Sequence, residues 1–569
     1  MTAFETRYNN TMEQLVRPGE PFELVDCPEI GRGSKAFLNA PKTMRELFAP
    51  AYKHGQKEFL LYEGERWSFE RLLHDSHAIG HWLLDHQGVE KGCRVAIAMR
   101  NCPEWMAAYI AITCIGAVVV PVNAWGQGPD IEFVLQDSGS TIVFCDQQRY
   151  DLLSTRFDEL GVVPIVVREK EGKPGGGALT YGQIVSNTGR TSMPDVDLGE
   201  SDEAMIMYTS GTTGFPKGAV STHRAVCQSI YATECQGAAM VLCNRERMDI
   251  LDGEGFPPCR LLSVPLFHVS GCHATFLVAI RSGTRLVMMY KWDLDTALRL
   301  VEAERVTRLG GAPKQVLEFL ESAADARSDL RSLGGFGIGG DATPPRLRRL
   351  IQEAMPHHMS GTGWGMTETN SIGTNTIGEL FDEQPASAGI CNPIVEISIR
   401  DKDFVEVPPG DDGEIWVRSV AMTREYWNRP EANAECFRDG WFNSGDLGRL
   451  DRNNCLYLSG RVKDVIIRGG ENVYPAEIES TFLQHADVQE AAVFGVDSEA
   501  MGEEVAVVVK LKSGSPMSEK DVLDYALQHL SHYKVPGHVF IADTPLPRTA
   551  TNKLMRDRIR ADYQIALAE

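Results

Sequence analysis

Several features that would place a protein in other classes are missing from this sequence. The first residues, MTAFETRYNN, lack a basic start followed by an apolar run, and the last three, LAE, are not a peroxisomal address. The apolar run 107–122 (AAYIAITCIGAVVVPV) contains Gly116 and Pro121, and it is shorter than the roughly 20 residues of a membrane span. We therefore expect a cytoplasmic protein without a transmembrane segment, in which this run forms a buried helix and a core strand.

Paired cysteines and an excess of positive charge are also missing. The thirteen cysteines form no CxxC pair and are odd in number, which favours reduced thiols in the core over disulfides or a zinc site. Lys and Arg number 56 against 78 Asp and Glu, a formal net charge of −22. This balance argues against nucleic acid as a partner, because a phosphate backbone favours clustered cations. Anionic small molecules remain possible, since local cations and backbone N–H groups can hold them.

The 569 residues exceed what one hydrophobic core usually serves. Short β-branched runs alternate with segments of helical periodicity, which predicts an α/β fold with mostly parallel sheets and crossover helices. The predicted strands are 94–99, 141–145, 205–209, 261–266, 284–289 and 396–400, and the predicted helices include 292–303 and 345–354. We interpret the polar stretches 171–178 and 245–258 as a surface turn and a surface excursion.

The composition changes near Gly460. The last part of the chain has its own alternation, with apolar runs at 491–494 and 505–511 and a helical pattern at 519–530. We therefore predict a large N-terminal body of several subdomains, residues 1–461, followed by a small α+β domain, residues 462–569.

Residues 208–218 (YTSGTTGFPKG) follow a short apolar run. Hydroxyl side chains, glycines that let backbone N–H groups approach phosphate oxygens, and one Lys are together typical of a phosphate-binding loop. This is not the Walker motif, because Pro216 and Gly218 flank the Lys where that motif has Gly and Ser or Thr. The predicted nucleotide contacts of the loop are Thr209, Ser210, Gly211, Thr212, Thr213, Gly214 and Lys217.

Together with this loop, later segments in the same order resemble the adenylate-forming superfamily, which includes acyl-CoA synthetases, luciferases and amino-acid adenylation domains. These segments are PLFH at 265–268, GGDA at 339–342, GWGMTET at 363–369, GEIWVR at 413–418, GWFNSGDLG at 440–448, GRVKDVIIRGGENVYPAEIE at 460–479 and PRTATNK at 547–553. The resemblance covers nearly the whole chain. It implies an AMP-forming ligase that uses ATP and Mg²⁺ to make an acyl adenylate and then transfers the acyl group to coenzyme A.

The resemblance also assigns the nucleotide site. Trp364 would stack on adenine, unless it is a core residue, and Asp446 would accept hydrogen bonds from the ribose, unless it only forms an Asx turn. Arg461 would contact ribose or phosphate, or else form an interdomain salt bridge. Glu368 and the hydroxyl of Thr212 would hold Mg²⁺. The other implied contacts are Gly340, Asp341, Gly363, Gly365 and Thr367.

Four residues are assigned to catalysis. They are Lys553, Lys217, His268 and Glu368. Lys553 would stabilise the charge that develops when the acid attacks the α-phosphate. The family usually has Gly before this Lys, where the chain has Asn552, a residue that tolerates positive φ better than most. His268 would line or gate the coenzyme A channel or be a packed core histidine, and the sequence leaves both open.

The resemblance implies that the small domain is mobile. Lys463 stands at the hinge of the family, about which the small domain turns after adenylation. Gly469 and Gly470 would then face coenzyme A, because a narrow channel needs backbone without side chains.

The acyl pocket implied by the resemblance has small or apolar walls. Its residues are Val269, Cys272, Gly311, Ala312, Gly339 and Thr362. None of them indicates a charged acid, and Gly365 stands where acetate ligases carry a Trp that shortens the pocket. We therefore expect a medium, long or bulky apolar acid, whether fatty, branched or aryl.

Three other functions remain open at this point. They are transfer of the acyl group to a carrier protein, a luciferase-type oxygenase, and a nucleotide-binding relative without catalysis. No carrier domain follows Lys553, which disfavours a self-contained assembly-line module. The sequence also leaves open whether the chain forms a homodimer.

Overall fold

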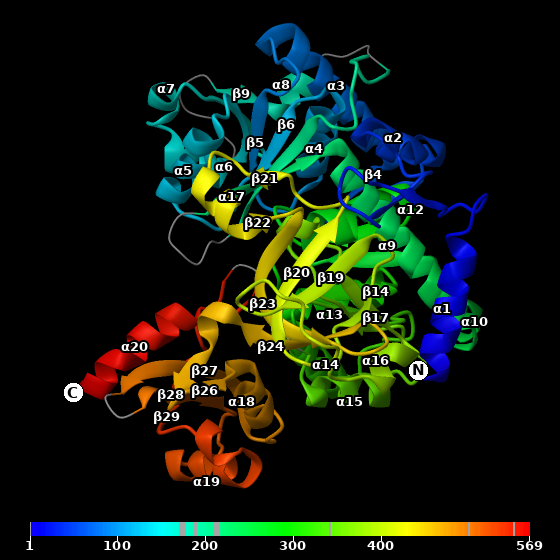
Figure 1. Ribbon diagram of the computed structural model, residues 1–569. Coiled ribbons are helices and arrows are strands. Elements are labelled where there is room, and N and C mark those ends of the chain that lie inside the picture. Colours follow the sequence, from blue (N-terminus) through cyan, green and yellow to red (C-terminus); the bar gives the residue numbers. More distant parts are fainter. Residues whose placement is uncertain are drawn as a thin grey trace.

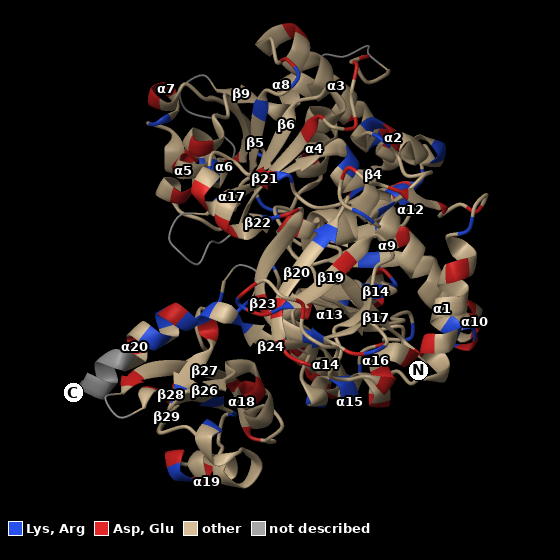
Figure 2. Ribbon diagram, in the orientation of Figure 1, with Lys and Arg blue, Asp and Glu red and all other residues tan. Residues whose placement is uncertain are grey.

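The computed structural model describes residues 2–169, 178–186, 191–209, 216–340, 343–498, 501–549 and 552–568. A large α/β body is followed by a small unit, which lies beside strands β23 (Trp441–Leu450) and β24 (Cys455–Arg461) of the body (Figure 1). Acidic and basic residues are interspersed along the elements of both parts (Figure 2). Among the described residues, no helix is long and apolar enough to cross a membrane.

The first sheet of the body comprises eight of the described strands, in the order β21-β11-β10-β6-β5-β7-β8-β9. They are β5 (Arg94–Ala98), β6 (Val118–Pro121), β7 (Ile142–Asp146), β8 (Val163–Val167), β9 (Leu179–Thr180), β10 (Glu203–Thr209), β11 (Lys217–Thr222) and β21 (Glu425–Tyr426). Strands β5 to β9 pair in parallel, whereas β10 and β11 are antiparallel. Thr209 therefore faces Lys217 across the predicted phosphate loop.

The second sheet comprises fourteen described strands and is mixed. Its parallel half holds β16 (Gly361–Thr362), β15 (Phe336–Ile338), β14 (Arg308–Gly311), β12 (Cys259–Leu262), β13 (Arg285–Met288) and β3 (Glu58–Tyr62), with β4 (Glu65–Ser68) antiparallel at the edge. Its antiparallel half holds β17 (Thr374–Ile377), β18 (Gly389–Cys391), β24, β23, β20 (Gly413–Ser419) and β19 (Val395–Arg400), with β22 (Phe437–Arg438) beside β23. The expectation of mostly parallel sheets therefore describes only part of this sheet. The antiparallel half combines a hairpin, β23 with β24, and pairs of strands far apart in the sequence, such as β18 with β24.

Helices cover one face of the parallel half. They are α13 (Leu294–Ala303), α14 (Pro313–Ala326) and α15 (Pro345–Ala354). Their apolar sides share a buried cluster with Leu261, Leu309 and Phe336 of the strands. The other helices of this region are α9 (His223–Cys243), α11 (Val269–Gly271), the π-helical segment Cys272–Leu277 and α12 (Val278–Ser282). Buried residues of α9, the π-helical segment and α12 share one cluster with strands of both sheets.

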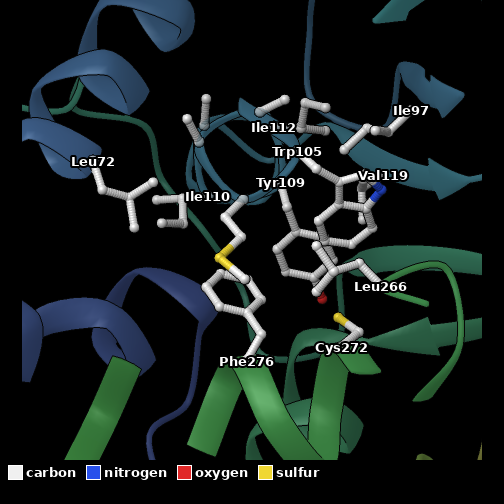
Figure 3. Close-up of a cluster of buried hydrophobic side chains, with 14 of the residues drawn as sticks. Leu72, Ile97, Trp105, Tyr109, Ile110, Ile112, Val119, Leu266, Cys272 and Phe276 are labelled. Atoms are coloured by element: carbon white, nitrogen blue, oxygen red, sulfur yellow. The ribbon is translucent and has the colours of Figure 1, made fainter. Parts of the chain in front are cut away.

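The main core joins α4 (Pro103–Cys114) to the π-helical segment (Figure 3). Trp105 and Tyr109 stack with ring centroids 5.3 Å apart, and Phe276 meets Tyr109 edge-on. Each residue of α4 and β6 is buried, so the prediction that 107–122 forms a buried helix and a core strand is confirmed. Full burial of each large apolar side chain contributes about 1.5–3 kcal/mol, which makes this cluster a rigid base for the segment that follows His268.

The small unit is an α+β sandwich of its own. Its described strands are β25 (Ile466–Arg468), β26 (Glu471–Val473), β27 (Val488–Ser498), β28 (Gly502–Leu511) and β29 (His538–Ile541), and its helices are α18 (Pro475–Phe482), α19 (Glu519–His529) and α20 (Arg556–Ala568). Apolar residues of β27, β28, α18 and α19 form a core separate from those of the body. The boundary at 461/462 stays a prediction.

Most predicted elements are present, with informative differences. The strand expected at 261–266 ends at Leu262, and Pro265 follows where a strand hydrogen bond would need an N–H group. The polar stretch 245–258 contains the surface helix α10 (Arg245–Gly253), which buries none of its residues. The turn expected at 171–178 lies almost wholly outside the described residues. All thirteen cysteines are unpaired, and most are buried.

Candidate active site

Glu368 lies in a short 3₁₀ turn, Thr367–Thr369, and is only 8% exposed. The hydroxyl of Tyr426 donates a hydrogen bond of 2.6 Å to its Oε1, and the backbone N–H of Thr423 donates to its carbonyl oxygen at 2.8 Å. Burial raises the pKa of this carboxyl, which the Tyr426 hydrogen bond partly offsets. The Lys217 ammonium lies 5.2 Å from the centre of the Tyr426 ring. Glu368, Tyr426 and Lys217 therefore form one cluster.

A second cluster is centred on Asp446 in β23. The indole N–H of Trp364 donates to its Oδ2 at 2.8 Å, and the Arg461 guanidinium lies 3.2 Å from its Oδ1. Trp364 is 6% exposed and also packs in a hydrophobic cluster of the body. The structure thus brings together Trp364, Asp446 and Arg461, the three residues that the resemblance assigned to adenine and ribose.

Lys553 lies at the end of a tight loop of the small unit. The backbone N–H of Thr549 donates to the Lys553 carbonyl at 2.8 Å, and the backbone N–H of Lys553 donates to the Thr549 hydroxyl at 3.2 Å. Between them Asn552 has a φ of 65°, in the left-handed region that Asn tolerates. Asn552 thus adopts a conformation that the Gly usual in the family would also allow.

The charge of Lys553 reaches residues of the body. Burial is the main cause that lowers the pKa of His268 to about 4, and the positive charge of Lys553 is the second cause. It also opposes the rise in the pKa of Glu368. Lys553 therefore lies within electrostatic range of both predicted catalytic residues of the body. His268 precedes α11 as its N-cap residue and packs against Phe267, with ring centroids 4.6 Å apart. Its lowered pKa leaves it uncharged at neutral pH.

Glycines surround these side chains where backbones approach closely. A Cβ on Gly365 would lie 2.5 Å from the carbonyl oxygen of Ser371, and a Cβ on Gly363 would meet the carbonyl oxygen of Thr374. Gly340 follows β15 with a φ of 89°. Gly365 thus has a second role besides leaving room for the acid, because any side chain there would require the Ser371 backbone to shift.

The remaining predicted residues fall into two groups. Ser210, Gly211, Thr212, Thr213, Gly214 and Asp341 lie outside the described residues. Lys463 lies in the 3₁₀ turn Val462–Asp464, with its ammonium 3.9 Å from Asp557 of α20. Gly469 and Gly470 form the turn between β25 and β26, with φ values of 60° and 88°. No contact joins these two glycines to Glu368 or Asp446 within the described part of the chain.

The sequence pattern did not single out Tyr426, which is the hydrogen-bond partner of Glu368 although it lies 58 residues away. It also missed Glu490, a carboxylate on β27 that is 2% exposed. The Lys314 ammonium of α14 lies 2.8 Å from one oxygen of Glu490, and the Arg548 guanidinium lies 3.0 Å from the other. No local signal marks such partners, since each contact spans different elements.

The comparisons with known proteins agree with this geometry. Residues 47–427 match the AMP-binding enzyme family, and residues 477–553 match the AMP-binding enzyme C-terminal domain. A long-chain fatty acid–CoA ligase of Mycobacterium tuberculosis is 33% identical over 84% of this chain and 90% of its own length. A 2-succinylbenzoate–CoA ligase of Geobacillus kaustophilus is 32% identical over 88% of this chain and 94% of its own.

Solved structures show the same fold. The o-succinylbenzoate CoA synthetase of Bacillus subtilis, in complex with its acyl-adenylate intermediate, superposes with a TM-score of 0.75 at 28% identity, covering 90% of this chain and 97% of that one. Fold and site together define an enzyme of the adenylate-forming superfamily, among whose members the matched relatives are CoA ligases. The chain belongs to the AMP-binding enzyme family.

Proposed function

We propose that this enzyme joins a carboxylic acid to coenzyme A through an acyl adenylate, with release of pyrophosphate and AMP. The observation that carries the proposal is the position of Lys553. Its charge lies within electrostatic range of both His268 and Glu368, so the small unit holds a cation near the predicted catalytic residues of the body. Attack of a carboxylate on the α-phosphate brings two anions together, and a positioned ammonium stabilises the charge that develops.

The residues around Glu368 fit a magnesium–phosphate site. A carboxylate oxygen is the donor that Mg²⁺ prefers, and the Tyr426 hydroxyl holds the Glu368 carboxylate in place by a 2.6 Å hydrogen bond. Mg²⁺ bound there would neutralise phosphate charge, with the Thr212 hydroxyl as its proposed second ligand. Lys217 and the loop 209–214 would bind the phosphates. Among the solved relatives, the o-succinylbenzoate synthetase of Bacillus subtilis has been solved with ATP and magnesium ion.

For the nucleoside, we assign Asp446 to the ribose hydroxyls, Trp364 to the adenine, and Arg461 to ribose or phosphate. The hydrogen bonds around Asp446 fix its carboxylate between the indole and the guanidinium, which orients its oxygens. Gly340, Asp341, Gly363 and Thr367 complete the proposed contacts.

The second half-reaction needs a different arrangement. We propose that the small domain, residues 462–569, turns about Lys463 after adenylation, withdraws Lys553 and presents Gly469 and Gly470 to coenzyme A. Lys463 lies in the 3₁₀ turn Val462–Asp464 at the start of this domain, with its ammonium 3.9 Å from Asp557 of the same domain. Arg556 and Asp464, 3.5 Å apart, also both belong to it, so a turn of the whole domain about Lys463 would break neither ion pair.

For the acid, we propose a medium, long or bulky apolar acyl group. The relatives named above act on a long-chain fatty acid and on 2-succinylbenzoate, and an Aromatoleum aromaticum relative, 31% identical, acts on indoleacetate. The small side chains at the predicted pocket wall support this range. A cytoplasmic location is supported by the unpaired cysteines.

A pyrophosphate-release assay over acids from acetate to long-chain and aryl acids, with and without Mg²⁺ and coenzyme A, tests the function. We expect multiple turnovers that require both, with AMP and an acyl thioester as products. Release of about one equivalent per enzyme, whether or not coenzyme A is present, would instead indicate an adenylate held for a carrier protein. Binding of ATP without any release would contradict catalysis altogether.

A further inference from the structure

Two arginines stand side by side on the parallel half of the large sheet. Arg260 of β12 is the register partner of Arg308 of β14, so their side chains leave the same face of neighbouring strands, which are roughly 4.8 Å apart. The Arg260 guanidinium donates to the carbonyl oxygen of Ala274 at 3.2 Å. Because Ala274 belongs to the π-helical segment that follows His268, both arginines lie on the face of the sheet that this segment covers.

These two arginines have no carboxylate partner. Arg308 donates to the carbonyl oxygen of Met359 at 2.5 Å, and in the described part of the chain neither Arg308 nor Arg260 forms an ion pair. Burial lowers the pKa of both groups, that of Arg308 to about 10 with a further contribution from Arg260. By contrast, Arg285 on the adjacent strand β13 pairs with Glu58 at 2.5 Å.

Glycines connect the arginine pair to the catalytic end of the strands. Gly310 lies two residues after Arg308 on β14 and pairs with Gly337 of β15. A Cβ on Gly310 would find its nearest atom 3.7 Å away, one on Gly337 at 4.0 Å, and one on Gly339 would meet no atom within 4 Å. Gly337 is exposed although its strand is central in the sheet. An open strip therefore runs along the sheet from Gly339 toward Arg308.

The strip has the length of an acyl group. In register, Arg308 is level with Gly335, four residues before Gly339, which corresponds to roughly 13 Å of strand. Predicted wall residues Gly311, Ala312 and Gly339 lie at its upper end, and the arginines lie at its lower end. A chain that enters with its reacting carboxyl near His268 would thus extend toward the two guanidinium groups.

Two neighbouring arginines without a carboxylate partner are unusual in a fold unless a bound anion balances their charge. Two half-buried cations on neighbouring strands, with no counter-ion among the described residues, destabilise the fold by partial desolvation and mutual repulsion. The two guanidinium groups together offer up to ten N–H donors, whereas two are used in the hydrogen bonds described. A planar carboxylate is the group that such forks bind best.

We propose that Arg260 and Arg308 bind an anionic group, a carboxylate, at the far end of the acid, so that the substrate is a dicarboxylic acid with an apolar middle. This inference rests on the proposed ligase function and narrows its substrate class. One carboxyl is activated at the Lys553 end, and the second stays ionised between the two guanidinium groups. The apolar wall residues contact only the segment between the two carboxylates.

The test compares matched acids with the full-length enzyme. Initial rates are measured for monocarboxylic acids and for the α,ω-dicarboxylic acids of equal length, such as octanoate and octanedioate, decanoate and decanedioate, and 4-phenylbutyrate and its ring carboxylate. We expect kcat/KM to favour the dicarboxylate by about 10–100-fold in at least one pair, the range of one or two charge-assisted hydrogen bonds. Arg308→Met and Arg260→Met should each lower that ratio by a similar factor.

Arg349→Met is the matched control, since Arg349 of α15 is exposed and its loss changes the net charge equally. It should leave the ratio unchanged. Turnover of monocarboxylates in preference to every dicarboxylate by the wild-type enzyme would overturn the inference while the ligase function stands, and this result needs no variant to fold. Absence of turnover with both classes would remove the ligase function and the inference with it.

Discussion

At the residue scale, the chemistry depends on ionisable groups held away from water. Glu368 is nearly buried, and its carboxylate keeps a single described side-chain partner, the Tyr426 hydroxyl. Burial raises its pKa, so ionised Glu368 lowers the stability of the folded enzyme when no cation is bound. His268 has a pKa of about 4 and contributes no charge at neutral pH.

Glu368→Gln keeps the hydrogen-bond acceptor and removes the charge. We expect pyrophosphate release to fall by about 100-fold or more, because an electrostatic contact to the transition state is lost. Without Mg²⁺ and nucleotide, the variant should be more stable than the wild type at neutral pH. The pKa of Glu368 in the folded enzyme lies above the ordinary value of 4.5. The wild type therefore loses stability as the pH rises from 4.5 through the folded pKa, where the buried carboxyl ionises.

Thermal unfolding at pH 4 and pH 7 checks this sign. The gain in melting temperature should be larger at pH 7 than at pH 4, because the wild-type carboxyl is protonated at the lower pH. A variant that is less stable at both values would show that Glu368 is stabilised by contacts rather than penalised by burial.

Lys553→Ala should separate the two half-reactions. Removing the ammonium that stabilises the attack on the α-phosphate should reduce pyrophosphate release at least about 100-fold. Thioester formation from a supplied acyl adenylate should remain, because that step does not use this charge. Lys520→Ala, which removes an exposed ammonium from α19 of the same unit, is the control. An equal loss of rate in both half-reactions would contradict the role proposed for Lys553.

At the element scale, the strands β14, β15 and β16 are shaped by glycines with different tasks. Gly365, after β16, is required by the close approach of the Ser371 carbonyl, whereas a side chain on Gly339, after β15, would enter open space. A larger residue at position 365 would shift the backbone and disturb Trp364 beside it. Position 339 is therefore the better place to test the predicted acyl pocket.

Gly339→Val should shift the acid preference toward shorter acyl groups. The added side chain would occupy space for about three carbons of the acyl group. Loss of room for one methylene changes the ratio of kcat/KM between two acids by about 10–200-fold. The profile of kcat/KM against chain length measures the shift, and the pyrophosphate release with the shortest accepted acid serves as its internal reference. An unchanged profile would mean that the acid lies elsewhere.

At the scale of the whole molecule, an ion-pair network joins the small unit to the body. The buried Glu490 carboxylate on β27 is shared by Lys314 of the body and Arg548 of the small unit. Arg548 also donates to the carbonyl oxygen of Asn552 at 2.7 Å, next to Lys553. The network thus ties the position of the Lys553 loop to the contact between the two parts.

Lys314→Met should weaken the contact between the two parts without changing any residue of the small unit. A buried carboxylate that loses one of two cations is strongly destabilised at that interface, so we expect adenylation to slow by about 10-fold. Thioester formation from supplied acyl adenylate should not slow, because it follows withdrawal of Lys553. Lys291→Met, at an exposed position, controls for charge. Stopped-flow kinetics measures the rate of each half-reaction. An equal effect on both would show that the network does not stabilise the adenylation arrangement of the two parts.

Local sequence determined much of this protein. The buried run 107–122, the helix 345–354 and the strand 205–209 follow from patterns contained within a few residues. The family motifs, read in order, identified Trp364, Asp446 and Arg461, which the structure places in one cluster.

Tertiary structure alone decided which side chains meet. Tyr426 contacts Glu368 across 58 residues and Lys314 contacts Glu490 across 176, and neither partner carries a local signal. No motif in the sequence marks Arg260 or Arg308, and only the parallel register sets them on one face beside open backbone. The physical reason is that hydrogen bonds and charges act over a few ångströms, and folding brings distant residues within that range.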